Sequence, residues 1–137
     1  MAVEESYMEE KEEIRQTEYQ LLGILLQHPD KIDEVADELE VKHFQCPQPQ
    51  LIFEMLLNQF QSNNQISRTK LFMQLKKEGV INNPEETIND LTSGFNTVEE
   101  LKPTIDIIKK NHQRRLLVKA ANKIKEITDD RELDISE

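Results

Sequence analysis

Residues 17–28 read Thr-Glu-Tyr-Gln-Leu-Leu-Gly-Ile-Leu-Leu-Gln-His, and this stretch decides the fold. A T-x-x-Q capping box begins at Thr17 and Pro29 ends the stretch, so we expect a helix over about residues 18–27. Nearly every residue from 19 to 26 is apolar, which predicts a helix that is buried on most of its sides. Gly23 lies inside it at a cost of about 1 kcal/mol relative to alanine. A second helix that approaches closely would explain that cost.

Four further helices are predicted downstream, because apolar residues recur there at helical spacing. We expect them over residues 31–39, 49–61, 68–78 and 84–94. Their predicted N-caps are Asp30 for the first of these, Ser67 for the third and Asn83 for the fourth, and Gly79 is a predicted C-terminal stop. The polar residues 61–65 are expected to form a loop.

The last predicted helix is the longest, because nothing from Pro103 to Asp130 breaks a helix. We expect a capping box at Thr97 and a kink at Pro103. A helix over residues 103–130 would span about 42 Å at 1.5 Å per residue. That exceeds the diameter of a compact chain of this length, so the helix should protrude from the head or pack along its full length.

These segments predict an all-α fold with a compact head of about five helices and a long protruding helix. The predicted domain organisation has four parts: an acidic flexible tail over residues 1–16, a head over 17–102, the long helix over 103–130 and an acidic tail over 131–137. The first part could equally be a frayed helix, because six glutamates occur within it.

Composition excludes several protein classes. The 137 residues carry a net charge of −10, and the longest apolar run, residues 21–26, is too short for a membrane span or a signal peptide. The single cysteine, Cys46, excludes an internal disulfide, and we expect a cytoplasmic protein. No glycine is followed by lysine, so a Walker A loop is absent and this chain alone should not hydrolyse ATP.

Charge is unevenly distributed along the chain. Residues 1–40 carry a net charge of −10, whereas residues 96–125 carry +5. An acidic domain is a poor DNA ligand, so we expect no strong direct DNA binding. The basic segment could instead contact an acidic partner.

The long helix presents two candidate interaction faces. The apolar face is predicted to close a hairpin or to mediate self-association, and it comprises Ile105, Ile108, His112, Leu116, Leu117, Ala120 and Ile124, with Ala121 and Ile127 beside it. The basic row comprises Arg115, Lys119 and Lys123. This row is either a partner-binding surface or a solvated helix face.

Catalytic and metal sites find little support in the sequence. His43 and Cys46 are spaced like two metal ligands, but a structural zinc site needs four and no second cysteine exists. Cys46 also lacks the motif that would orient a catalytic thiol, so an inert structural cysteine is favoured. We therefore expect no catalytic residue, metal or cofactor in this chain.

Four stretches, taken in order, carry a family resemblance. They are residues 17–28, with Leu-Gly before an aliphatic run; 43–56, with Phe-x-x-Pro before Leu-Ile-Phe-Glu-Met-Leu; 66–79, ending in Leu-Lys-Lys-Glu-Gly; and 107–121, with Ile-Ile-Lys-Lys before Leu-Val-Lys-Ala-Ala. In order and spacing, over about residues 17–130, they resemble the N-terminal domain of DnaB-type replicative DNA helicases.

The resemblance implies a helical head followed by a helical hairpin, of which residues 103–130 would be the first arm and 131–137 the start of a truncated second arm. It implies self-association into dimers, or a hexameric collar in the full-length protein, and docking of the helicase-binding domain of primase or of a loader. ATP and magnesium would belong to a motor domain that this chain lacks. Two positions depart from the family pattern: the chain ends near the expected second arm, and Pro103-Thr104 replace paired aromatic residues.

Two alternatives stay open at this point. The first is a stand-alone, phage-type loader or inhibitor of a helicase with the same fold. The second, from another class, is a small enzyme that uses Cys46.

Overall fold

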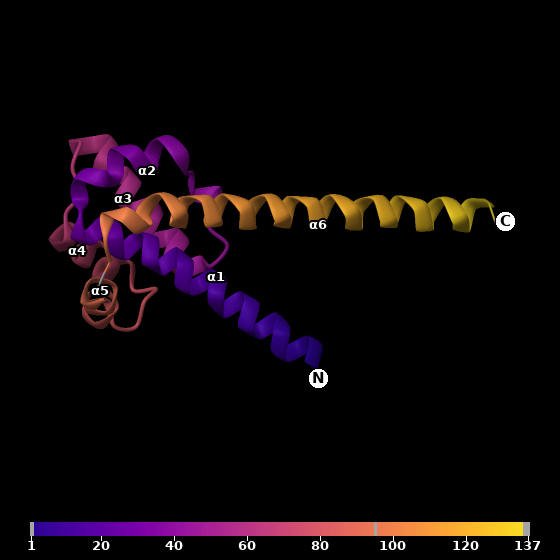
Figure 1. The fold of residues 1–137 in the computed structure, drawn as a ribbon, viewed down its shortest axis with the longest axis horizontal. Helices are drawn as coiled ribbons and strands as arrows, with labels where there is room; N and C mark the ends of the chain where they lie inside the picture. The colour runs from indigo at the N-terminus through magenta and orange to yellow at the C-terminus, as the bar shows by residue number, and fades with distance from the viewer. Residues whose placement is uncertain (1, 95, 136–137) are drawn as a thin grey trace.

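The computed structural model describes the backbone of residues 2–94 and 96–135 and the side chains of residues 9–94 and 96–130. Within these residues the chain forms helices and no strand, which confirms the all-α prediction (Figure 1). The α-helices are α1 (Ala2–Gln27), α2 (Ile32–Glu38), α3 (Pro47–Asn63), α4 (Arg68–Glu78), α5 (Pro84–Ser93) and α6 (Leu101–Ile135). Three short 3-10 helices connect them: η1 (Pro29–Lys31), η2 (Val41–His43) and η3 (Val98–Glu100).

The core of the head surrounds the second half of α1. Residues 21–26 are all buried, as the apolar run predicts, and α1 packs against α3, α5 and α6. Gly23 faces α5 closely: a Cβ atom built there would lie 2.6 Å from the Leu91 carbonyl oxygen. A close helix approach therefore accounts for this glycine.

Local capping signals are confirmed for two helices. The Ser67 side chain accepts a hydrogen bond from the Lys70 N–H at the start of α4. The Asn83 side chain accepts one from the Glu86 N–H at the start of α5. Gly79 ends α4 with φ of 68°, in the left-handed region that glycine adopts without strain.

Three predicted caps are wrong. Thr17 does not begin a helix, because α1 starts at Ala2 and the Thr17 hydroxyl donates to the Glu13 carbonyl one turn earlier. The N-cap of α2 is Lys31 rather than Asp30, which lies inside η1. Thr97 makes no side-chain cap and precedes η3.

The predicted loop over residues 61–65 begins later than expected, and the predicted kink at Pro103 is absent. α3 continues to Asn63, and Asn64 ends it in the left-handed conformation that asparagine tolerates. α6 begins at Leu101 and runs unbroken through Pro103, because a missing N–H in the first turn breaks no helical hydrogen bond.

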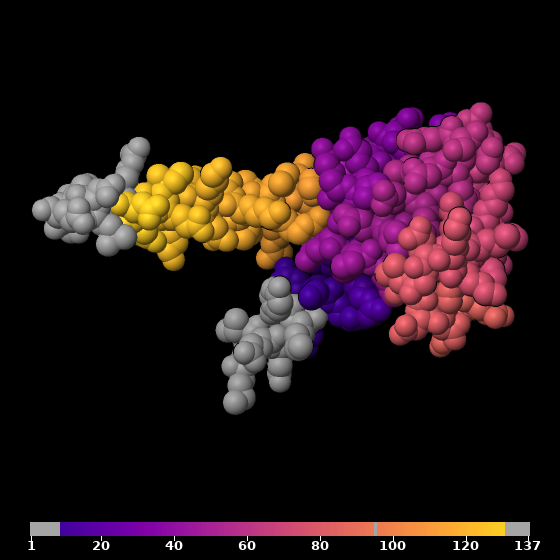
Figure 2. Space-filling model, turned by 180° about the vertical axis from the view of Figure 1, so that it is seen from behind, coloured from indigo at the N-terminus to yellow at the C-terminus, as the bar shows by residue number. Residues whose placement is uncertain are grey.

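The helix α6 protrudes instead of packing along its full length. Ile105 and Ile108 are buried in the head, whereas every residue from 116 to 130 is exposed. Figures 1 and 2 show the resulting rod, which extends about 30 Å beyond Arg115 at 1.5 Å per residue. Among the described residues, no helix combines the length and the apolarity that a membrane crossing requires.

The predicted domain limits stay a prediction, because helix bounds alone do not define domains. α1 includes most of the segment expected to be an acidic tail, and α6 continues through residues 131–135. Residues 136–137 lie outside the described residues.

Replacing Gly23 with alanine tests the close packing of α1 on α5. Helix propensity alone would stabilise this variant by about 1 kcal/mol, but the new methyl group would clash with backbone. We expect its free energy of unfolding to fall by about 1–3 kcal/mol in urea titrations. Gly94→Ala is the matched control, because its Cβ would meet only the Asn96 side chain, at 3.6 Å or more. A stabilised Gly23→Ala protein would contradict the described packing.

Candidate functional site

The predicted apolar face of α6 divides into two parts. Ile105 and Ile108 are 3% and 1% exposed and belong to the core, and His112 is half-buried where the helix leaves the head. The remaining members, Leu116, Leu117, Ala120 and Ile124, are exposed. The reason is that α6 leaves the head after Arg115, so residues 116–130 are exposed on every side of the helix.

Beyond the head, three members of the predicted face and the adjacent Ile127 form a straight apolar face. Leu117, Ala120, Ile124 and Ile127 follow 3-4-3 spacing, which keeps side chains on one side of a helix. Leu117 and Ile124 are 71% and 65% exposed. No described residue covers this free face, which we define by these four side chains.

The three residues of the basic row differ in their exposure. Lys119 and Lys123 are exposed, but Arg115 turns toward the head. Its guanidinium donates to the His43 carbonyl at 3.0 Å and to Gln45 Oε1 at 3.1 Å. Arg115 therefore fixes α6 to the segment between η2 and α3, and only the two lysines stay free for a partner.

Glu18 is the buried carboxylate beneath this contact. It is 1% exposed, and its two oxygens accept the N–H groups of Gln45 and Cys46 at 2.8 and 2.9 Å. Burial raises the pKa of Glu18, while these hydrogen bonds and the positive charge of Arg115 act in the opposite direction. Sequence reasoning missed this role, although a lone acid beside a fully apolar helical run was a signal for it.

His43 and Cys46 are structural neighbours of the same contact. The rings of His43 and His112 meet edge to face at 4.7 Å between centroids, and the His43 Nδ1 accepts the Glu40 N–H. Cys46 is buried at the start of α3, and burial raises the pKa of its thiol, which disfavours the thiolate needed for nucleophilic catalysis. Among residues 9–94 and 96–130, no group of three or more His, Cys, Asp or Glu side chains could hold a metal ion.

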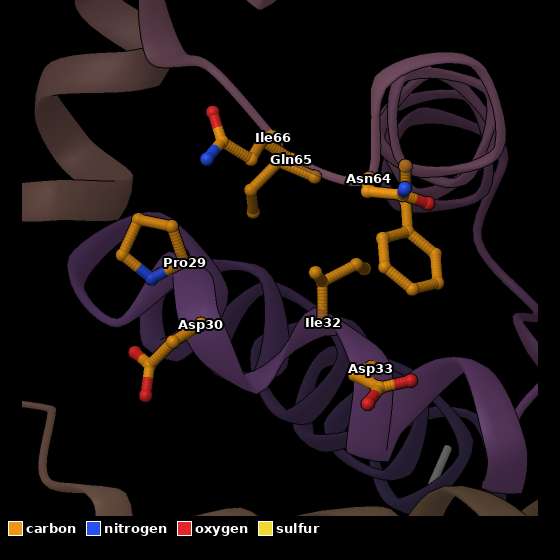
Figure 3. A pocket seen from close by; sticks show the side chains of 8 residues that line it. Pro29, Asp30, Ile32, Asp33, Asn64, Gln65 and Ile66 are labelled. Carbon is orange, nitrogen blue, oxygen red and sulfur yellow. The ribbon is translucent and has the colours of Figure 1, made fainter.

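A separate hollow lies on the head, between η1 and the start of α2 on one side and residues 64–66 on the other (Figure 3). Its volume is about 650 Å³. Ile32 points into the space, whereas Asp30 and Asp33 lie at its rim with their carboxylates turned outward. The carboxylates therefore do not converge on a ligand inside it.

Comparison with protein families gives a match over most of the chain. A family model described as the DnaB-like helicase N-terminal domain matches residues 10–110, about three quarters of the chain. The match includes the head and the first turns of α6, and it ends before the exposed part of that helix. Neither the curated proteins nor the solved structures contain a match to this chain.

Truncating Arg115 tests the attachment of α6 to the head. Arg115→Ala removes the hydrogen bonds to His43 and Gln45 and the positive charge that acts on the buried Glu18 carboxylate, so we expect the free energy of unfolding to fall by about 2–3 kcal/mol. Lys123→Ala, in the same row but exposed, should change it by less than about 0.5 kcal/mol. Equal effects of the two substitutions in urea titrations would contradict the proposed attachment.

The lowered pKa of His112 predicts that the stability of the folded chain depends on pH. Burial lowers its pKa below 6.5, and His43, Arg115, Lys42 and Lys119 lower it further. Because the unfolded chain binds this proton more readily, stability is lost as pH falls below about 6.5. We expect the melting temperature to drop between about pH 7 and pH 5.5, and to drop less in His112→Gln. An unchanged pH profile in the variant would assign the effect to other groups.

Proposed function

The chain belongs to the DnaB-like helicase N-terminal domain family, and from this premise we propose that it is the noncatalytic N-terminal part of a replicative DNA helicase. In this proposal it mediates assembly of the helicase ring and docks primase or a loader in the primosome, in the cytoplasm. The chain itself uses no cofactor, and ATP hydrolysis with magnesium belongs to the motor domain of the parent helicase.

The observation that carries the proposal is the free face of α6. A soluble monomer rarely leaves a straight row of large apolar side chains uncovered along a projecting helix. The 3-4-3 spacing of Leu117, Ala120, Ile124 and Ile127 suits a second helix that packs alongside. That helix is either the second arm of a hairpin or α6 of another copy.

Docking of primase is supported by the charge of the same helix. Residues 96–125 carry +5 in a chain of net charge −10, and Lys119 and Lys123 are exposed on the projecting part. A basic surface beside an apolar one suits a protein partner with acidic residues at its rim.

Isothermal titration calorimetry with the helicase-binding domain of the cognate primase tests the docking. We expect a one-to-one complex of micromolar affinity that weakens at higher salt. Absence of heat at much higher concentrations would contradict docking by this chain. If the chain instead changes DNA unwinding by an intact helicase, the stand-alone loader or inhibitor becomes the better assignment.

Self-association through the free face has its own test. In Ile124→Asp a carboxylate would have to be buried between helices, so we expect the dissociation constant of the dimer to rise at least about tenfold in sedimentation experiments. Asn122→Asp adds the same charge on the opposite side of α6 and should leave it nearly unchanged. A wild-type chain that stays monomeric at all concentrations would contradict self-association by this face.

A further inference from the structure

The helices α1 and α6 diverge where they leave the head (Figure 1). A cleft lies between them, lined by residues of both helices and by Gln45. Its volume is about 360 Å³, within the range of ligand-binding clefts. The apolar side chains that line it are Ile14 from α1 and Val118 from α6, and Val118 is 54% exposed. Gln45 lines the end of the cleft nearest the head. The floor is thus aliphatic and open to solvent.

The walls of this cleft are positively charged, although the chain as a whole is acidic. Four cations line it, Lys11, Arg114, Arg115 and Lys119, against one acid, Glu10. The Glu10 carboxylate is already bound to the Arg114 guanidinium at 2.7 Å. Arg115 donates to oxygens of His43 and Gln45, lies 3.4 Å from the His112 Nδ1, and its charge acts on the buried Glu18 carboxylate. Apart from Arg114, which is paired with Glu10, and Arg115, which lies near Glu18, the cleft therefore combines an aliphatic floor with the positive charges of Lys11 and Lys119.

An aliphatic floor flanked by positive charges favours some classes of ligand over others. A carboxylate-bearing protein segment can place an aliphatic side chain on the floor and its acids on the lysines. A nucleic acid would use the cations but not the floor, and none of the lining residues is an aromatic side chain on which a base could stack. Two diverging helices also form a groove into which the ridge of a third helix can pack.

We propose that the cleft between α1 and α6 binds an acidic amphipathic helix of a partner protein. An aliphatic side chain of that helix lies between Ile14 and Val118, and its flanking carboxylates pair with Lys11 and Lys119. The inference rests on the proposed docking function and gives the chemistry of the docked partner. It also assigns a role to the first half of α1, which the sequence pattern left as an acidic tail.

Titration of the isotope-labelled chain with a synthetic peptide tests binding in the cleft without primase. Peptide binding in the cleft and docking of primase can therefore fail separately. The probe is an acetylated and amidated peptide of about 14 residues made of Glu, Ala and Leu, with leucines at i, i+3, i+4 and i+7. We expect NMR signals of Ile14 and Val118 to shift with this peptide. A peptide with Lys in place of each Glu should leave them unmoved. Equal shifts with both peptides would overturn the charge argument.

Two double variants distinguish peptide binding in the cleft from a general effect of the protein's charge on peptide affinity. Lys11→Gln combined with Lys119→Gln should weaken the peptide about fivefold, because each exposed ion pair contributes modestly. Lys76→Gln combined with Lys77→Gln removes the same charge from α4, which Figure 1 places on the other side of the head, and should change affinity less than about twofold. Equal losses in both variants would overturn the proposal. So would shifts of Ile14 and Val118 with protein concentration alone, because a second copy would then occupy the cleft.

Discussion

Burial of residues 21–26 of α1 is the constraint on which the head depends. A helix that is apolar on all sides needs neighbours on all sides, and α3, α5 and α6 supply them. Gly23 permits close contact with the backbone of α5. Glu18 lies about one turn before this apolar segment, and its carboxylate can be buried because the N–H groups of Gln45 and Cys46 donate to its two oxygens. One helix therefore sets both the packing of the core and the place where a charge must be compensated.

The direction of α6 follows from the same helix. Ile105 and Ile108 pack into the core, and Arg115 makes the last contacts with the head. From residue 116 to residue 130 the helix is exposed on every side, so its apolar and basic residues there are available to partners. The first half of α1 leaves the head beside it, and the Glu10–Arg114 ion pair joins the two helices near the point where they diverge.

Features set by neighbours in sequence could be predicted, whereas contacts between distant segments could not. Ser67, Gly79 and Asn83 were assigned correctly because a cap depends on residues within one turn. Thr17 was assigned wrongly because its pattern also fits a helix interior, and contacts with α6 favour the longer helix. The exposure of Lys119 follows from its place on a charged helix face, but the inward turn of Arg115 depends on residues some 70 positions earlier in the chain. The cleft was missed for the same reason, since each of its walls alone resembles a solvated helix.

The unsupported length of α6 has a mechanical consequence. Its far end lies about 30 Å from the Arg115 contact, so a rotation of about 10° at that contact moves the end by about 5 Å. This sideways displacement is about as large as the pitch of one helical turn, and shifts of that size accompany repacking at allosteric interfaces. The projecting part of α6 is therefore a lever arm that is fixed to the head at one end. A small change at the polar contact around Glu18, His112 and Arg115 would produce a large movement at the far end of α6.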